Sequence, residues 1–340
     1  MVRVRFAPSP TGSLHLGNAL SAAANRRYAD EHGGALLLRI DDTDAARGVP
    51  GGAAAILADL EWLGIAWEEG PLRQSERHVR HREAAHLVGE PDADGALRFG
   101  RTTLLRADGS ATYQLASAVD DVDFGITHVI RGSDHRANEE IQSALVGALG
   151  GEPPQYLHHG LLLGDDGRKL SKRHGASSLA DLREAGLPAE AVRAYLEELG
   201  LPRHDVHLDP ARLRRLSTEA LAALSDEELA ARVGVPLSAV PAMRGARDLR
   251  EAREYAEQVL QPVRVPVDAP ETLARLRELV ERGLDPRSVV RELKAVGGDL
   301  KSVRLALTGR ERGPELAAVI ESLERGELLI RLKRCASTTR

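Results

Sequence analysis

The sequence predicts an α/β fold, in which a parallel sheet covered by helices is followed by an all-helical C-terminal part. Three observations support this prediction. Up to about residue 195, short apolar runs alternate with helical patterns, as expected for strands joined by crossover helices. After that point strand signals vanish, and from Pro210 onward Leu- and Ala-rich stretches are separated by Pro and Gly. The 340 residues, of which 42% are hydrophobic, suffice for two or three domains with separate cores.

The sequence pattern of the first part of the chain predicts two strands, each followed by a helix. Residues 2–6 alternate between apolar and charged side chains, and residues 35–40 form an apolar run that is typical of a buried strand. Residues 18–31 are expected to be helical. Residues 51–63 carry apolar side chains at spacings of three and four, which also favours a helix.

The middle of the chain continues this organisation after a break. Residues 89–100 contain Pro, Gly and Asp at several positions and are expected to form a loop. Residues 112–118 and 125–130 alternate like strands, and residues 137–149 are the next expected helix. From residue 210 onward, only helices are expected.

The composition excludes several classes of protein. The formal net charge is -5 and aromatic residues make up 3%, so the whole chain shows no sign of a polyanionic partner or of broad base-stacking platforms. The single cysteine, Cys335, excludes an internal disulfide and a Cys-rich zinc site, and it fits a reducing cytoplasm. No apolar run approaches the roughly 18 to 20 residues of a membrane span, and no signal-peptide pattern follows Met1. We therefore expect a cytoplasmic protein with no membrane partner.

The segment from Arg5 to Asn18 is the most informative part of the chain. A strand leads into the rigid sequence Pro-Ser-Pro-Thr-Gly, and the next helix is expected to begin near His15. The exposed N–H groups of a helix N-terminus favour phosphate, and His15 can donate to a phosphate oxygen. Gly17 would let a nucleotide approach the backbone. Taken alone, however, this short pattern favours a structural histidine.

Three carboxylates, Asp41, Asp42 and Asp44, follow the second predicted strand. Ligands of open α/β sheets bind at the carboxyl ends of the strands, so Asp41 can pair there with an ammonium group of a substrate. Asp42, Thr43 and Asp44 are also good helix caps, and at least one of these three residues is expected only to cap a helix.

Arg131 stands at the end of a later apolar strand, where its guanidinium can bind a carboxylate through two hydrogen bonds. A surface ion pair is the alternative explanation. Asp134 and His135 follow, and without a third ligand in the pattern we expect a capping Asp and a polar His rather than a metal pair.

Residues 164–175 form a glycine-bounded, basic segment, and four of the six residues from 168 to 173 are cationic. Such a loop can close over a triphosphate and neutralise the charge that spreads onto pyrophosphate. The Walker A spacing is absent. A basic surface turn explains the segment when it is considered alone.

Taken together, these segments resemble the class I aminoacyl-tRNA synthetases, and specifically the glutamyl-tRNA synthetases. His-Leu-Gly-Asn at residues 15–18 resembles the first signature of the family, and Lys-Leu-Ser-Lys-Arg at residues 169–173 resembles the second. Further matches occur in order at residues 39–44, 73–77, 113–121, 125–135, 304–309 and 313–316. This ordered agreement outweighs the structural explanations given above for single motifs.

The resemblance implies a Rossmann-like catalytic domain that activates L-glutamate with ATP to glutamyl-adenylate. It further implies transfer of the glutamyl group to the 3′ end of tRNA(Glu). Mg2+ would arrive with ATP and need no protein-built metal site. No zinc is expected, and a monomer is expected.

The resemblance also implies roles for individual residues. The expected catalytic residues are His15, Gly17, Lys169 and Lys172. The expected glutamate-binding residues are Arg5, Ala7, Ser9, Asp41, Tyr113 and Arg131, with Asp41 on the α-ammonium and with Tyr113 and Arg131 on the carboxylates. The expected ATP-binding residues are Pro8, Thr11, His15, Gly17, Asn18, Lys169, Leu170, Ser171, Lys172 and Arg173.

The chain departs from the family pattern in places. Asp41 stands where many members have Glu, and Ser117 stands where Asn is often found. Only about 35 residues separate Arg77 from Tyr113, where the family usually inserts a subdomain for the tRNA acceptor end. The expected domains are a catalytic domain at 1–195 with a reduced insertion at 78–110, a helical stem-contact region at 196–250 and a compact anticodon-binding region at 251–340.

Two other functions are considered. A synthetase paralogue would glutamylate a modified tRNA base or another non-standard acceptor; the reduced insertion favours it and the retained C-terminal motifs disfavour it. A catalytically silent tRNA-binding or regulatory protein would not need His15, Gly17, Lys169 and Lys172, which are all present.

Overall fold

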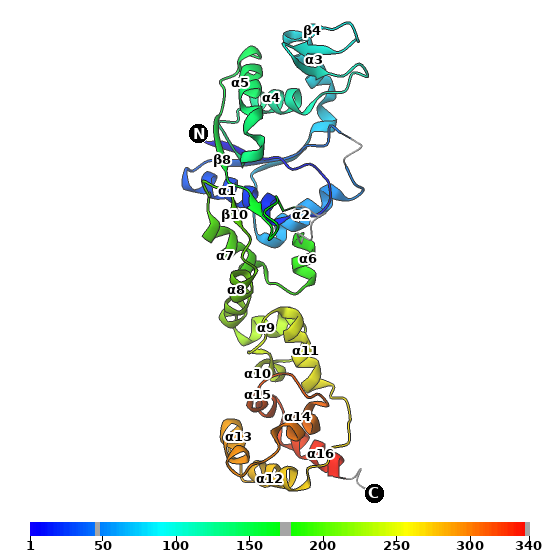
Figure 1. The fold of residues 1–340 in the computed structure, drawn as a ribbon, viewed down its shortest axis with the longest axis vertical. Helices are drawn as coiled ribbons and strands as arrows, with labels where there is room; N and C mark the ends of the chain where they lie inside the picture. Colours follow the sequence, from blue (N-terminus) through cyan, green and yellow to red (C-terminus); the bar gives the residue numbers. More distant parts are fainter. Residues whose placement is uncertain (45–47, 171–177, 337–340) are drawn as a thin grey trace. The chain divides into compact units, whose positions relative to one another are not determined.

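The computed structural model describes residues 1–44, 48–170 and 178–336 (Figure 1). Its contacts divide the chain into two compact units. The first unit contains Met1–Leu182 and Arg193–Asp209, and the second contains Arg183–Val192 and Pro210–Arg340.

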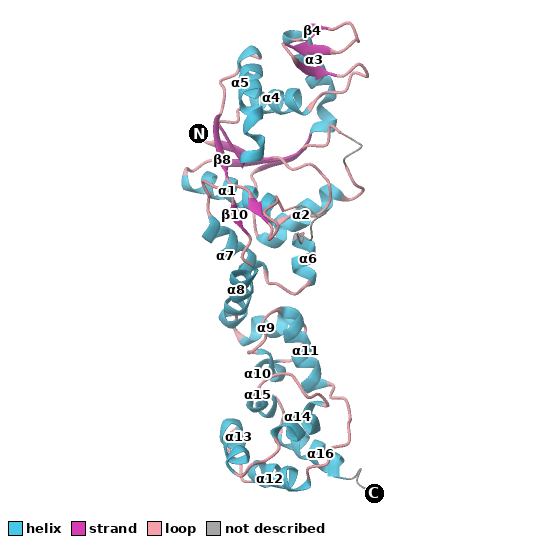
Figure 2. Ribbon diagram, viewed as in Figure 1, coloured by secondary structure: helices cyan, strands magenta, loops and turns pink. Residues whose placement is uncertain are grey.

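A five-stranded parallel sheet forms the centre of the first unit (Figure 2). Its strands are β1 (Arg3–Phe6), β2 (Ala35–Ile40), β3 (Glu69–Arg73), β7 (His128–Gly132) and β8 (Gln155–His159), in the order β3-β2-β1-β7-β8. All but the first residue of β2 are buried, as expected for a parallel strand covered on both faces. The predicted α/β class is therefore confirmed, as are the predicted strands at 2–6 and 35–40.

Helices cover both faces of this sheet (Figure 1). α1 (Leu16–Glu31) and α2 (Gly52–Leu63) connect strands that step from β1 toward β3, whereas α5 (Glu139–Ala148) connects β7 to β8 in the opposite direction. Crossovers between parallel strands are right-handed, so the reversal of direction places α5 on the opposite face from α1 and α2. These helices confirm the predictions at 18–31, 51–63 and 137–149.

The predicted strand at 112–118 is wrong, because this segment begins the helix α4 (Tyr113–Asp123). Buried Leu115, Ala118 and Val119 lie at helical spacing and pack in one core cluster. The alternation of Tyr, Gln, Leu, Ala and Ser over five residues imitates a strand, since a short window cannot separate the two periods.

The predicted loop at 89–100 is also corrected. Asp92, Asp94 and Gly95 lie between β4 (Glu90–Pro91) and β5 (Leu97–Phe99), which form a three-stranded antiparallel sheet with β6 (Thr102–Leu105). This small sheet follows α3 (His78–Val88). Strands of two or three residues are too short to give a recognisable period, so only the turn was visible in the sequence.

The first unit also contains a pair of short strands outside these two sheets. β9 (Leu162–Leu163) pairs in parallel with β10 (Val206–His207), so the prediction of no strand after residue 195 is wrong by this one element. The remaining elements with residues in this unit are η1 (Gln74–Arg77), η2 (Ser133–Asn138), α6 (Leu179–Glu184) and α7 (Ala189–Leu199).

The second unit is helical throughout its described residues from Pro210 onward, which confirms the predicted helical C-terminal part. Its helices are α8 (Pro210–Ala223), α9 (Asp226–Val233), η4 (Leu237–Ala239), α10 (Val240–Met243), α11 (Leu249–Leu260), α12 (Pro270–Glu281), α13 (Pro286–Ala295), α14 (Leu300–Thr308), α15 (Leu316–Glu321) and α16 (Arg325–Ala336). Leu229 and Met243 belong to one core of this unit, and Leu276 and Leu307 belong to a larger one.

Local capping residues explain where several of these helices begin and end. Ser225 and Glu228 form a reciprocal capping box at the start of α9, and the side chain of Asp248 accepts a backbone hydrogen bond at the start of α11. Gly234 and Gly309 end α9 and α14 in the left-handed conformation that glycine adopts without strain. No helix of the described ranges is long and apolar enough to cross a membrane.

Candidate active site

The first unit contains a cavity of about 420 Å³ at the carboxyl ends of β1 and β7. The strand order reverses between these neighbours, because β1 continues through α1 to β2 on one side and β7 continues through α5 to β8 on the other. Ligands of open α/β sheets bind at such a point. The predicted site residues that line the cavity are Arg5, Ala7, Pro8, Ser9, Thr11, His15, Gly17, Asn18, Asp41, Tyr113, Arg131 and Lys169.

The loop after β1 is held in place by a carboxylate of α2. Asp59 is buried, and its Oδ2 accepts hydrogen bonds from Ser13 Oγ at 2.7 Å and from the backbone N–H of Leu14 at 2.7 Å. The loop is thereby fixed immediately before α1. The sequence did not indicate this role for Asp59, because no local pattern connects it with residues 45 and 46 positions earlier.

His15 is the N-cap of α1, as the sequence predicted for the start of this helix. Its Nδ1 accepts a hydrogen bond from the backbone N–H of Asn18 at 3.2 Å. The neutral ring therefore carries its proton on Nε2. At Gly17, a Cβ atom would lie 3.1 Å from the His15 ring, so the missing side chain leaves room for this histidine over the first turn.

Arg39 on β2 connects the acidic residues of the site. Its Nε and Nη2 donate to the two oxygens of Asp41 at 2.7 and 3.2 Å, and its Nη1 donates to Asp121 of α4 at 3.0 Å. Arg5 also donates to Asp121, at 3.3 Å. Burial would lower the pKa of Arg39, but Asp41 and Asp121 outweigh burial and raise this pKa. Asp41 thus lines the cavity while paired with a fully buried cation.

Asp120, the neighbouring residue of α4, is completely buried, lies 3.8 Å from Arg39 Nε and has different hydrogen-bond partners. It accepts hydrogen bonds from Gln74 Nε2, Arg77 Nε and His81 Nε2, each at 2.8 Å. Asp121 therefore connects α4 to the strands β1 and β2. Asp120 connects α4 to η1 and α3. Tyr113, at the start of α4, is placed beside the cavity by this helix rather than by the predicted strand.

Arg131, in β7, lies beside neutral groups. Its Nη1 donates to Gln142 Oε1 of α5 at 2.7 Å, its Nε donates to His158 Nε2 of β8 at 3.3 Å, and its guanidinium carbon lies 5.0 Å from the ring centre of Tyr156. Its Nη2 is buried and has no hydrogen-bond partner. Burial lowers the pKa of Arg131.

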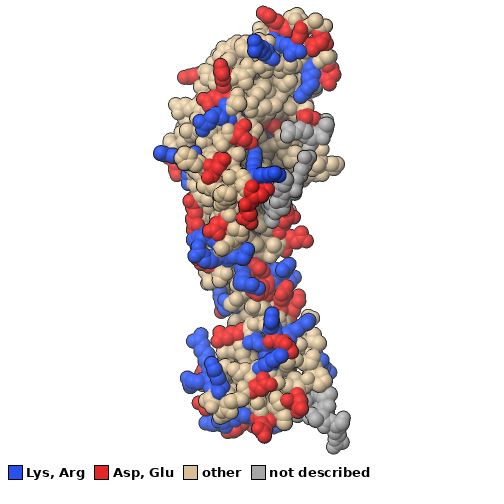
Figure 3. Space-filling model, viewed as in Figure 1, with Lys and Arg blue, Asp and Glu red and all other residues tan. Residues whose placement is uncertain are grey.

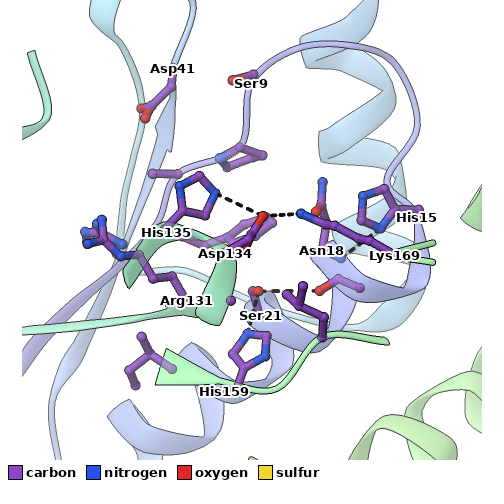
Figure 4. Close-up of a pocket in the computed structure, with 18 of the residues that line it drawn as sticks. Ser9, His15, Asn18, Ser21, Asp41, Arg131, Asp134, His135, His159 and Lys169 are labelled. Carbon is purple, nitrogen blue, oxygen red and sulfur yellow. Dashed lines mark hydrogen bonds and ion pairs between the residues drawn. The ribbon is translucent and has the colours of Figure 1, made fainter. Parts of the chain in front are cut away.

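Lys169 and Asp134 point toward one another in the cavity and form an ion pair (Figure 4). Asp134 and His135 follow β7 and line the cavity, although the sequence favoured a capping role for the first and an ordinary polar role for the second. Burial lowers the pKa of His135, which favours its neutral ring. His159 also lines the cavity and lies 2.8 Å from Ser21 Oγ of α1.

Of the remaining predicted ATP contacts, only Leu170 lies within the described residues. Leu170 is buried and is absent from the lining residues. Ser171, Lys172 and Arg173 lie outside the described residues. Among the side chains that the structure does describe, no group of three or more His, Cys, Asp and Glu is arranged to hold a metal ion.

Comparison with known proteins agrees with this geometry. Residues 1–90 and 95–209 match the family of class I tRNA synthetases (E and Q), catalytic domain. Glutamate–tRNA ligase 1 of Rubrobacter xylanophilus is 37% identical, and the alignment covers 98% of this chain and 97% of that protein. Glutamate–tRNA ligase 1 of Rhodospirillum rubrum is 34% identical, with 98% of each chain covered.

Both alignments are longer than the 340 residues of this chain, at 419 and 437 positions, so these relatives contain segments that this chain lacks. The fold is also similar to that of a glutamate tRNA ligase from Elizabethkingia meningosepticum, with a TM-score of 0.77 at 22% identity over 100% of both chains. From the family match, and from relatives that align over nearly its whole length, we conclude that the chain belongs to the glutamate–tRNA ligases, a family of class I tRNA synthetases.

Proposed function

We propose that this protein activates L-glutamate with ATP to glutamyl-adenylate and then transfers the glutamyl group to the 3′ end of tRNA(Glu). The observation that carries the proposal is Arg131, a buried cation in the wall of the switch-point cavity, with one guanidinium nitrogen that has no partner. Relatives named glutamate–tRNA ligase align with 98% of the chain, which supports the same reaction and does not favour glutamylation of a modified base or another acceptor.

Glutamate would be held at the ends of β1, β2 and β7, where Ala7 and Ser9 also line the cavity. Arg5, Tyr113 and Arg131 are assigned to its two carboxylates. Asp41 is assigned to the α-ammonium group. Asp41 already accepts two hydrogen bonds from Arg39, but each carboxylate oxygen has a second acceptor site, so an ammonium group can be added.

ATP would lie against the start of α1, with Pro8, Thr11 and Asn18 as further contacts. Backbone N–H groups at a helix N-terminus carry partial positive charge and favour phosphate. In the activation step, an oxygen of the glutamate α-carboxylate attacks the α-phosphorus, and the bond to the bridging oxygen breaks. Negative charge then moves onto the leaving pyrophosphate. Mg2+ is assigned to this step as a companion of ATP.

His15 and Lys169 are assigned to stabilise that developing charge by hydrogen bonding, with Gly17 leaving space beside them. Such preorganised donors act most strongly where charge accumulates in the transition state. Lys169 is held by Asp134 in the structure, so it would exchange this partner for a phosphate. Lys172 and the adjoining Leu170, Ser171 and Arg173 are proposed as additional contacts of the same loop.

In the transfer step, a hydroxyl of the terminal tRNA ribose attacks the carbonyl carbon of the adenylate, and AMP leaves. We assign residues 1–195 to catalysis with a reduced acceptor-end insertion at 78–110, residues 196–250 to stem contact and residues 251–340 to anticodon binding. Lys and Arg side chains are interspersed with Asp and Glu over the visible face of the second unit (Figure 3), which supplies cations for phosphate contacts.

The remaining parts of the proposal concern the state of the protein in the cell. It would act as a monomer in the cytoplasm, with tRNA and small molecules as its partners and with no membrane partner. The single cysteine of the chain fits the reducing conditions of that compartment.

The test is to incubate the protein with ATP, labelled glutamate and total tRNA, and to identify the bond that holds the label. We expect an alkali-labile ester, and we expect no label on tRNA from which the terminal adenosine has been removed. Label that appears on a base or on a protein would contradict the proposal.

A further inference from the structure

The contacts of Arg131 differ from those of the other buried arginines in this site. Arg5 and Arg39 each contact a carboxylate within 3.3 Å. In the described part of the chain, no carboxylate lies within 4 Å of the Arg131 guanidinium nitrogens, and the hydrogen-bond acceptors around it are an amide oxygen and an imidazole nitrogen.

His158 supplies one of these neutral contacts because of its position in the sheet. It is the register partner of Arg131 across the parallel strands β7 and β8. Its Nε2 accepts from Arg131, and its Nδ1 lies 3.5 Å from Glu139 Oε2. This arrangement selects the neutral ring with the proton on Nδ1. Burial, followed by the charge of Arg131, lowers the pKa of His158 to about 4, so the ring is neutral at physiological pH.

Gln142 and Tyr156 complete the surroundings. Gln142 is 2% exposed and presents its amide oxygen to Nη1, and Tyr156 lies two residues before His158 on β8, with its ring near the guanidinium. Together they fix the plane of the guanidinium without placing a negative charge on it. Nη2 is buried and has no hydrogen-bond partner, and Arg131 lines the cavity.

We propose that Gln142, His158 and Tyr156 are positioning residues that give the site its preference for an acid over an amide. They hold Arg131 with neutral contacts only, so that the carboxylate of the amino acid side chain supplies the missing negative charge. Glutamine has the same shape but is neutral, and it would leave the cation uncompensated. The inference rests on the proposed function, because it names how that function selects its substrate.

The decisive variant is Gln142→Glu, which keeps the size of the side chain and places a carboxylate on Arg131. We expect the preference for glutamate over glutamine, measured as the ratio of kcat/KM, to fall by about thirtyfold. The KM for glutamate should rise, and the KM for ATP should stay within twofold of the wild-type value. The readout is amino-acid-dependent ATP–pyrophosphate exchange in the presence of tRNA.

Two controls separate charge from other effects. Gln142→Met removes the hydrogen bond without adding charge, so it should raise the KM for glutamate and retain most of the preference over glutamine. Gln155→Glu makes the same charge change at an exposed residue of β8 and should leave all constants unchanged. Thermal unfolding checks that each variant is folded. If Gln142→Glu does not fold, His158→Glu places a carboxylate on the other side of the same guanidinium and carries the same expectation.

The possible outcomes distinguish this inference from the proposed function. If the wild-type protein shows no glutamate-dependent exchange, the proposed function itself fails. If the wild-type protein is active but Gln142→Glu keeps the wild-type ratio, or loses activity equally with both amino acids, only the inference is overturned. A selective loss of discrimination in Gln142→Glu, absent from Gln142→Met, supports it.

Discussion

Lys169 forms an ion pair with Asp134, a carboxylate that lies two residues after the end of β7. The partners come from segments 35 residues apart, and both line the cavity. The pair holds the lysine of the proposed phosphate-binding loop against the end of β7 when no phosphate is bound. If Lys169 binds phosphate as proposed, ATP would have to replace Asp134 as its partner.

The first prediction concerns the strength of this competition. Asp134→Asn should lower the KM for ATP by about two- to fivefold, because a partly exposed ion pair contributes at most about 1 kcal/mol and its loss frees Lys169 for phosphate. The KM is measured by ATP–pyrophosphate exchange at saturating glutamate. An increase in the KM for ATP would show that Asp134 supports the bound nucleotide instead of competing with it.

The second prediction concerns Lys169 itself. Lys169→Ala should lower kcat for glutamate activation by about 100-fold, which is typical when one donor to the transition-state charge is removed. The affinity for tRNA should change little, since the contact is made to ATP. Exchange kinetics and filter binding of tRNA measure the two quantities separately, and equal losses in both would argue against the assigned role.

The third prediction concerns Arg39, which contacts Asp41 and Asp121 while almost fully buried. Arg39→Met should destabilise the protein by about 3 to 5 kcal/mol, because it leaves the buried Asp41 without its cation and removes one of the two arginines that contact Asp121. Urea denaturation measures this loss. Arg98→Met is the matched control: it breaks an ion pair with Asp92 at a partly exposed position, and no comparable loss is expected. Equal effects of the two substitutions would contradict the role of Arg39.

The fourth prediction concerns pH. The pKa of His158 is lowered to about 4 in the folded protein, against about 6.5 in an unfolded chain. Between these values the unfolded chain binds more protons, so acidification from pH 6.5 toward pH 4 favours unfolding through this residue. His158→Gln removes that contribution. Between pH 7 and pH 5, the wild-type protein should lose about 1 to 2 kcal/mol more stability than the variant, as measured by urea denaturation. Parallel pH profiles would contradict the lowered pKa.

The sequence predicted those parts of the fold that depend on local pattern. The apolar run of β2 and the spacing in α2 were sufficient, because a buried strand and an amphipathic helix impose their periods on neighbouring residues. The start of α4 was not predicted, since Leu115, Ala118 and Val119 are consistent with a helix only when the length of the element is known.

The candidate site was predictable to a similar degree. Motif residues such as His15 and Arg131 were identified and line one cavity. The residues that hold them were not, because Asp59, Gln142 and His158 reach their partners only through the tertiary fold. A polar residue within an otherwise apolar strand or helix indicates that its side chain has a hydrogen-bond partner, but the sequence pattern does not identify that partner.

The most direct test of the central claim is to measure charging of tRNA by the wild-type protein with ATP and with labelled glutamate, glutamine or aspartate in parallel. We expect rapid, ATP-dependent charging with glutamate and a kcat/KM for glutamine and for aspartate that is lower by at least about 100-fold. Equal charging with glutamine, or no charging with glutamate, would contradict it.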